Sequence, residues 1–169
     1  LFRSGQAIFG ANNTPTTVYG ISPEYLDIRR YKVEEGDIFS EQDVKTAAKV
    51  CLVGKSVVDE LFPDGESPVG KVIRFGKIPL RIVGVLESKG YNSMGMDQDD
   101  LILAPYTTVQ KRILAITHLQ SITCSALSEE YTDQAIEEIT QILRANHKLK
   151  ATDEDDFTIR SQQEDRKST

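Results

Sequence analysis

Long apolar runs are missing from this sequence of 169 residues. No stretch approaches the roughly 20 apolar residues that a membrane-spanning helix needs, and the chain does not open with a signal peptide. Histidine occurs only twice, and neither His118 nor His147 has a cysteine or carboxylate at metal-ligand spacing. Zinc motifs, a Ser-His-acid arrangement and a dinucleotide fingerprint are all missing. The sequence therefore predicts no catalytic residue, no cofactor site and no metal site.

A glycine-rich phosphate loop is also missing, although Gly54-Lys55-Ser56 lies between a predicted strand and a predicted helix. A phosphate loop needs another glycine five positions before its second glycine. Lys49 occupies that position, so we expect no nucleotide binding here. The acidic trio Asp97, Asp99 and Asp100 lacks the alternating ligands and closing glutamate of a calcium loop.

Excess positive charge is missing as well, because 26 acidic and 20 basic residues give a net charge of −6. No basic stripe with interleaved aromatic residues is present, which excludes nucleic acid as an expected partner. Only two cysteines occur, Cys51 and Cys124, and two cysteines neither prove nor exclude a disulfide. We favour free thiols, because buried cysteines commonly behave as small apolar residues.

What the sequence does contain is a compact pattern of strand, helix and hairpin over residues 49–88. An apolar β-like run ends at Gly54, and apolar residues at helical spacing lead to Leu61 and Phe62. A loop with Pro68 and Gly70 follows, and then two strands joined by a tight turn at Gly76. Gly84, within the second strand, predicts a bulge or a close backbone approach. We expect Phe62 to anchor the core.

The flanking regions predict further elements. Before the central pattern we expect a hairpin over residues 6–21, a short helix after Ser22-Pro23 and a helix over residues 41–47 that a capping box at Ser40 begins. After it we expect strands over residues 101–104, 119–127 and 157–160, and helices over residues 107–114 and 129–146. The last strand, helix and strand form a βαβ unit with the apolar face of the long helix on the sheet.

Several motifs together resemble the MacB-like periplasmic core domain of ABC-transporter permeases, in the MacB/FtsX-like permease family. They are V-x-G-I-S-P-E-Y from Val18, E-G-D-I-F from Glu35, L-F-x5-P-V-G-K from Leu61, I-V-G-V-L from Ile82 and D-D-L-I-L-A-P-Y from Asp99. The resemblance covers residues 18–160. The motif residues that we expect to be structural are Gly36, Leu61, Phe62, Pro68, Gly70, Lys71 and Gly84.

The resemblance implies an α+β fold with two subdomains. A porter-like part that contains the βαβ unit would comprise residues 1–36 and 107–169, and a smaller β-rich part, residues 37–106, would be inserted in it. The family domain lies between the first and second membrane helices of its permease. We therefore expect this chain, which begins with Leu1 rather than methionine, to be a segment of a longer membrane protein.

The resemblance also implies a function. We expect a non-enzymatic domain on the periplasmic side of the bacterial inner membrane that couples cytoplasmic ATP hydrolysis to a periplasmic partner or cargo, by export or by mechanotransmission. Its implied partners are the membrane helices of its own chain, a cytoplasmic ABC ATPase, a periplasmic adaptor or other periplasmic protein, and a second copy in a full-length homodimer.

Two other functions stay open from the residues alone. The first is a small-molecule-binding regulatory module, because a sheet with a βαβ unit can host a ligand cleft. The second is a hydrolase whose site is assembled from scattered residues. Stabilisation by a metabolite would favour the module, and turnover of generic esters or phosphates would favour the hydrolase.

Residues 89–100 form the candidate partner-contact loop. Two glycines loosen this stretch, and Tyr91, Met94, Met96 and Asp97 supply adaptable apolar contacts and a charge. Large apolar side chains in a polar loop indicate a contact surface. We expect replacement of residues 88–98 by a short Gly-Ser link to leave the melting temperature nearly unchanged.

Overall fold

The computed structural model of the chain describes residues 1–162, and it comprises two compact units. The first unit is Leu1–Thr123, and the second is Cys124–Thr169. Strands and helices both contribute to the described chain, so the predicted mixed α and β character is confirmed.

Seven strands of the first unit form one sheet among residues 1–162. They are β1 (Phe2–Phe9), β2 (Asn12–Ile21), β3 (Val33–Gly36), β4 (Val50–Val53), β5 (Val72–Phe75), β6 (Ile78–Leu86) and β7 (Ile102–Pro105). Their order is β3-β6-β4-β7-β2-β1-β5, and β5 also pairs with β6. Six strands therefore close into a ring, and β3 pairs with the second half of β6 outside the ring.

Both predicted hairpins are confirmed. β1 and β2 pair antiparallel along their whole length, from Phe2 opposite Tyr19 to Phe9 opposite Asn12. β5 and β6 pair antiparallel across the turn at Gly76, whose φ of 59° is a left-handed conformation that suits glycine. Each hairpin brings apolar side chains to the same face because residues two apart on a strand point the same way.

Three short helices connect strands of the first unit: α1 (Tyr25–Arg29), α2 (Glu41–Thr46) and α3 (Lys55–Leu61). α4 (Tyr106–Thr108) and the π-helical segment η1 (Val109–Leu114) follow β7. The predicted capping box of α2 is confirmed. The Ser40 hydroxyl accepts a hydrogen bond from Asp43 N at 3.2 Å, and the Asp43 carboxylate accepts one from Ser40 N at 2.8 Å. The helix therefore begins where its first free backbone N–H groups find local acceptors.

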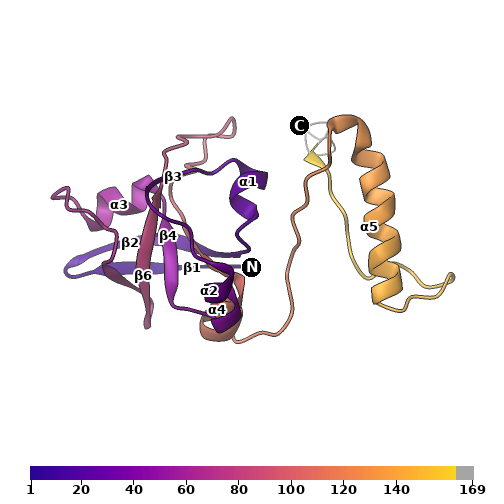
Figure 1. Cartoon of the computed structure of the whole chain (residues 1–169), viewed down its shortest axis with the longest axis horizontal. Helices are drawn as coiled ribbons and strands as arrows, with labels where there is room; N and C mark the ends of the chain where they lie inside the picture. Colours follow the sequence, from indigo (N-terminus) through magenta and orange to yellow (C-terminus); the bar gives the residue numbers. More distant parts are fainter. Residues whose placement is uncertain (163–169) are drawn as a thin grey trace. The chain divides into compact units, whose positions relative to one another are not determined.

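The core lies on both faces of the sheet. Along β4, Cys51 and Val53 belong to the larger apolar cluster, whereas Val50 and Leu52 belong to a second cluster on the other face. α3 adds Leu61 to the larger cluster and packs against β1, β2 and β6 (Figure 1). Residues buried on both faces explain why β4 is apolar at every position rather than at alternate ones.

Phe62, directly after α3, is 4% exposed, as a core anchor must be. Its ring centroid lies 4.4 Å from that of Phe9 at the end of β1. An aromatic contact at this distance adds to the stabilisation from burial alone. Phe62 therefore fastens the end of α3 to the β1–β2 hairpin.

Gly36 and Gly84 allow β3 and β6 to approach closely. The two residues are paired in the sheet, and a Cβ atom on Gly36 would lie 2.2 Å from the Val83 carbonyl oxygen. A Cβ atom on Gly84 would lie 2.6 Å from the Asp37 carbonyl oxygen. The register of β6 against β4 also shifts at this point. The bulge and the close approach predicted for Gly84 are both confirmed.

The remaining motif residues shape the turn before β5. Pro68 is buried, and Gly70 has a φ of 85° and donates its N–H to the Ile82 carbonyl at 2.7 Å. The exposed Lys71 ammonium lies 3.4 Å from the Glu66 carboxylate. The turn thus directs the chain into β5 through backbone geometry, and its exposed ion pair contributes little.

The second unit contains one turn of 3₁₀ helix (Glu129–Tyr131) and α5 (Thr132–Asn146), in agreement with the predicted long helix. The predicted strands over residues 119–127 and 157–160 are wrong, because both segments are irregular. The predicted βαβ unit is therefore not formed by the described residues. β-forming side chains make a strand only where another strand offers hydrogen bonds. Here Leu119, Ile122 and Leu127 are exposed instead.

The predicted subdomain boundaries, residues 1–36 and 107–169 against residues 37–106, stay a prediction. The structure joins strands from residues 1–36 and from residues 37–106 in one sheet. Its own division falls after Thr123.

Replacement of Phe62 by alanine should lower the free energy of unfolding by about 3–5 kcal/mol, because the ring is buried and its removal leaves a cavity. Denaturant melts of the chain measure this loss. Phe2, which is 57% exposed, provides the matched control, and Phe2→Ala should cost less than about 1 kcal/mol. Equal losses in the two variants would show that Phe62 is not an anchor.

The two cysteines are free and differ in exposure: Cys51 is buried and Cys124 is exposed. Burial raises the pKa of the Cys51 thiol far above its usual value, so little reactive thiolate is available there. A thiol reagent should therefore modify Cys124 quickly in the native protein and Cys51 only after denaturation. Fast modification of Cys51 in the native Cys124→Ser variant would contradict the buried position of β4.

Candidate functional site

The candidate partner-contact loop, residues 89–100, lies between β6 and β7 and has a polar base and an apolar tip. Asp99 organises the base. Its side chain is 6% exposed, and its carboxylate accepts hydrogen bonds from Ser88 Oγ at 2.6 Å, Lys89 N at 2.7 Å and Gly90 N at 2.9 Å. These donors bring the two ends of the loop together over a single buried carboxylate.

Burial alone would raise the pKa of Asp99, but the hydrogen bonds from Lys89 N, Ser88 Oγ and Gly90 N lower it by more. The net effect is a pKa below the ordinary aspartate value of 3.8. The ionised carboxylate is thus the form that the folded loop stabilises, because donors to a carboxylate favour its charge.

Asp97 fastens the same base to α3. Its carboxylate accepts hydrogen bonds from Ser56 Oγ at 2.6 Å and from Asp99 N at 2.8 Å. Asp97 is half-buried, and both of its oxygen atoms already have partners within the protein. Its role in contacting a partner stays a prediction, and the geometry gives it a supporting role.

Close backbone contact completes the base. A Cβ atom on Gly54 would lie 2.1 Å from the Asp99 carbonyl oxygen. Any side chain at position 54 would therefore collide with the loop backbone, and only glycine allows this close approach at the junction of β4 and α3. Lys55 pairs with Glu34 at 2.9 Å, and Ser56 donates to Asp97. All three residues of the Gly54-Lys55-Ser56 segment therefore have structural roles.

α1 and the residues after it also support the loop. Tyr31 is partly buried, and burial together with neighbouring Tyr25 and Tyr19 raises its pKa to about 12. The protonated Tyr31 hydroxyl donates a hydrogen bond to the Gln98 carbonyl at 3.4 Å. The Lys89 ammonium lies 4.2 Å from the centroid of the Tyr31 ring, a cation–π contact.

The tip presents three large apolar side chains to solvent. Tyr91 is 73% exposed, Met94 is 81% exposed and Met96 is 61% exposed. Asn92 holds this tip in a defined turn, because its side-chain oxygen accepts hydrogen bonds from Met94 N at 2.9 Å and Met96 N at 3.0 Å. Gly95 follows with a φ of 76°. The tip is thus an ordered apolar surface, which is typical of a contact site.

The hydrogen bonds separate the part of the loop that supports the fold from the part that does not. Replacement of residues 88–98 would remove all three donors to Asp99 and the contact of Asp97 with Ser56. Because an unpaired buried carboxylate is costly, we now expect that replacement to destabilise the first unit. Substitutions at Tyr91, Met94 and Met96 leave the base intact.

Sequence reasoning found the apolar tip and missed its organising residues. The sequence pattern identified Asp99 only as a member of the acidic trio, and it gave no role to Asn92. An aspartate three residues before β7 and an asparagine three residues before Gly95 are the available signals, since both side chains commonly accept backbone hydrogen bonds in turns. Their partners become visible only in the folded chain.

Residues 1–162 contain neither a metal-binding cluster nor a membrane-spanning helix. Within that range, no group of three or more His, Cys, Asp or Glu side chains is placed to hold a metal ion. Over the same residues, no helix combines the length and the apolar character needed to cross a bilayer.

A family model decides what kind of domain this is. The model described as the MacB-like periplasmic core domain matches residues 1–142, which is most of the chain. The chain belongs to this family. The family resemblance seen in the sequence motifs is therefore confirmed.

Relatives and solved structures agree with this membership. The macrolide export ATP-binding/permease protein MacB of Syntrophobacter fumaroxidans is 42% identical over 132 residues, which are 76% of this chain and 18% of that protein. The periplasmic region of MacB from Actinobacillus actinomycetemcomitans has a TM-score of 0.74 at 27% identity, over 87% of this chain and 64% of that chain. The chain is thus homologous to the periplasmic domain of a MacB-type ABC-transporter permease and spans less than a fifth of the curated relative.

A second solved structure shares the fold. The extracellular domain of the noncanonic ABC-type transporter YknZ from Gram-positive bacteria has a TM-score of 0.73 at 21% identity, over 88% of this chain and 74% of that chain. The MacB-like periplasmic core fold therefore includes proteins whose sequences have diverged widely.

Replacement of Asp99 by asparagine should reduce the free energy of unfolding near pH 7 by about 1–3 kcal/mol, because the charge-assisted hydrogen bonds at the loop base are lost. The folded pKa of Asp99 lies below the unfolded value. Its stabilisation is therefore complete above the unfolded pKa and is lost as the pH falls through the folded pKa. The difference between the wild type and Asp99→Asn should shrink as the pH falls below about 4.

Denaturant melts at several pH values measure this difference. Asp64→Asn, at an exposed position of the turn after α3, is the control and should change stability little at any pH. A gap between the wild type and Asp99→Asn that is the same at acid and neutral pH would refute the role given to the ionised carboxylate.

Proposed function

We propose that this chain is the periplasmic domain of an ABC-transporter permease and that it couples ATP hydrolysis in a cytoplasmic ATPase to a periplasmic partner or cargo. The domain itself catalyses no reaction in this proposal. Membership in the family of MacB-like periplasmic core domains supports the setting. The name of the Syntrophobacter relative, an ATP-binding and permease protein for macrolide export, supports the link to ATP-driven transport.

The observation that carries the proposal is the ordered apolar tip at Tyr91, Met94 and Met96 on a fastened base. A ring of paired strands is a stiff support, and the base connects the loop to α3 through Ser56 and Asp97 and to Tyr31 through Gln98. A displacement of this scaffold would therefore move the tip with it. Methionine side chains adapt their shape to a partner surface at low cost, so the tip suits a contact that forms and breaks during a transport cycle.

Simultaneous replacement of Tyr91, Met94 and Met96 by serine tests the proposal in the intact transporter. We expect partner-dependent export or signalling to fall about tenfold or more, since loss of about 1.4 kcal/mol of contact energy has that effect. The melting temperature of the isolated chain should stay nearly unchanged, because the base contacts remain.

Val72→Thr is the matched control, because Val72 is an apolar residue on β5 that is 52% exposed and far from the loop in sequence. It should leave transport unchanged. Full transport in the triple variant would reject the tip as a contact surface, and a large fall in its melting temperature would show that the tip supports the fold instead.

A further inference from the structure

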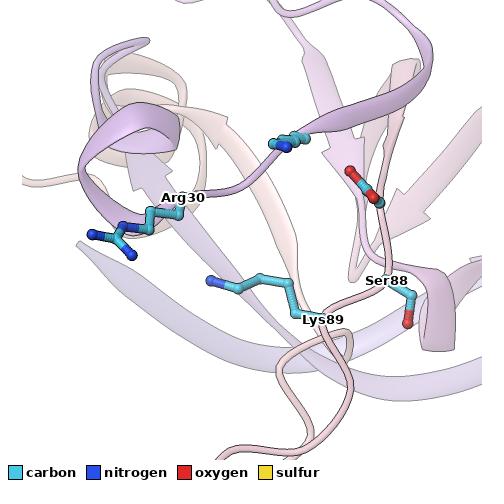
Figure 2. A pocket seen from close by; sticks show the side chains of 5 residues that line it. Arg30, Ser88 and Lys89 are labelled. Atoms are coloured by element: carbon cyan, nitrogen blue, oxygen red, sulfur yellow. The ribbon is translucent and has the colours of Figure 1, made fainter.

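A basic cavity lies beside the loop base and contains none of the apolar tip residues. Its walls are Arg30, Lys32, Glu87, Ser88 and Lys89. Figure 2 shows the Lys89 side chain extending toward the end of α1 where Arg30 lies, with Ser88 directed elsewhere. Three cationic side chains and one carboxylate leave two net positive charges here, although the whole chain has a net charge of −6.

No carboxylate of the described residues forms an ion pair with the cations of this cavity, although Asp99 interacts electrostatically with Lys89. Four ion pairs are formed among residues 1–162, and none includes Arg30, Lys32 or Lys89. Glu87 directs its backbone N–H to the Lys32 carbonyl at 2.7 Å, but its carboxylate forms no ion pair in the same part of the chain. The guanidinium of Arg30 thus keeps its planar set of donors for another group.

Lys89 is held in place and partly desolvated. Its ammonium donates a hydrogen bond to the Arg29 carbonyl at 2.7 Å and lies over the Tyr31 ring. Burial lowers the pKa of Lys89, Arg29 and Arg30 lower it further, and Asp99 opposes them. Fixed cations that repel one another favour the binding of an anion, which would relieve that repulsion.

The size of the cavity limits what it can hold. Its volume is about 210 Å³, and a water molecule occupies roughly 30 Å³ in the liquid. A group of several heavy atoms therefore fits, whereas a drug-sized ligand needs roughly 300–1,000 Å³. Ser88 is not a free donor, because its hydroxyl already donates to Asp99 at 2.6 Å.

We infer that this cavity binds the phosphate group of a phosphate monoester, with Arg30, Lys32 and Lys89 as its ligands. A phosphate monoester has a charge of about −1.5 to −2 near neutral pH, which matches the two net positive charges better than a single carboxylate does. The Arg30 fork can bind two phosphate oxygens at once, and the two lysines supply point charges. The Glu87 carboxylate weakens the attraction of the cavity for an anion, because it offsets one of the three positive charges.

Titration of the full 169-residue chain with inorganic phosphate at constant ionic strength tests the inference. We expect saturable changes in the backbone NMR signals of Arg30, Lys32 and Lys89 at millimolar phosphate, and none with sodium chloride. Arg30→Gln with Lys32→Gln should weaken binding about tenfold or more, as loss of two charged contacts predicts. Glu87→Gln should tighten binding several-fold, which damage to the fold would not do.

Lys77→Gln with Arg81→Gln removes the same charge from exposed positions at the β5–β6 turn and on β6, and it should change the affinity less than about twofold. Equal weakening in this control and in the cavity variant would overturn the inference. Binding of succinate that is tighter than that of phosphate would also overturn it, as would binding of a polyglutamate peptide without any binding of phosphate.

Vesicles distinguish two sources of the phosphate. If the chain sediments with phosphatidylcholine vesicles that contain phosphatidic acid, and not with pure phosphatidylcholine, the cavity accepts a lipid headgroup. If free phosphate binds and such vesicles do not, the ligand is a soluble phosphate ester. The inference does not depend on the proposed transport role, and failure of one leaves the other intact.

Discussion

The first unit depends on the pairing of one long strand with three others. β6 pairs with β5 through Ile78–Arg81, with β4 through Arg81–Val85 and with β3 through Gly84–Leu86. The first half of β6 pairs with β5 and so closes the ring. Its second half pairs with β3, which lies outside the ring. This arrangement is sterically allowed only because Gly36 and Gly84 have no side chains where the two backbones meet. Every other element of the unit is placed relative to this ring.

The loop after β6 is attached to this sheet at both of its ends. It leaves the end of β6 and returns to β7, and the buried Asp99 carboxylate joins its two ends. Buried charges are stable only when donors surround them, so the loop base depends on the hydrogen bonds that Ser88, Lys89 and Gly90 donate to Asp99. These bonds explain how an exposed apolar tip can be ordered without regular secondary structure. Ser88 and Lys89 also line the basic cavity.

Charged and apolar side chains fall in different parts of this region. The tip has no charged group at Tyr91, Met94 or Met96, whereas the cavity concentrates cations from two separate segments, residues 30–32 and residue 89. A single extended surface would mix these features. Their separation favours two distinct ligands, an apolar protein surface for the tip and an anionic group for the cavity.

Local signals in the sequence determined most of the first unit. The capping box at Ser40, the hairpin turn at Gly76 and the apolar spacing of α3 act between near neighbours, so they were predictable from the residues. The family motifs have the same origin, since Leu61, Phe62, Pro68 and Gly70 fix one continuous turn of chain. Gly84 within a strand-like run signalled a close backbone approach, but the residues that approach it, Gly36 and Asp37, come from a distant part of the chain. Tertiary structure alone decided which strands close the ring and which donors surround Asp99. It brought Arg30 and Lys32 to the same cavity as Lys89. It also decided that residues 119–127 and 157–160 form no strand, because a strand exists only where a partner backbone offers hydrogen bonds, and side-chain preference cannot supply that partner.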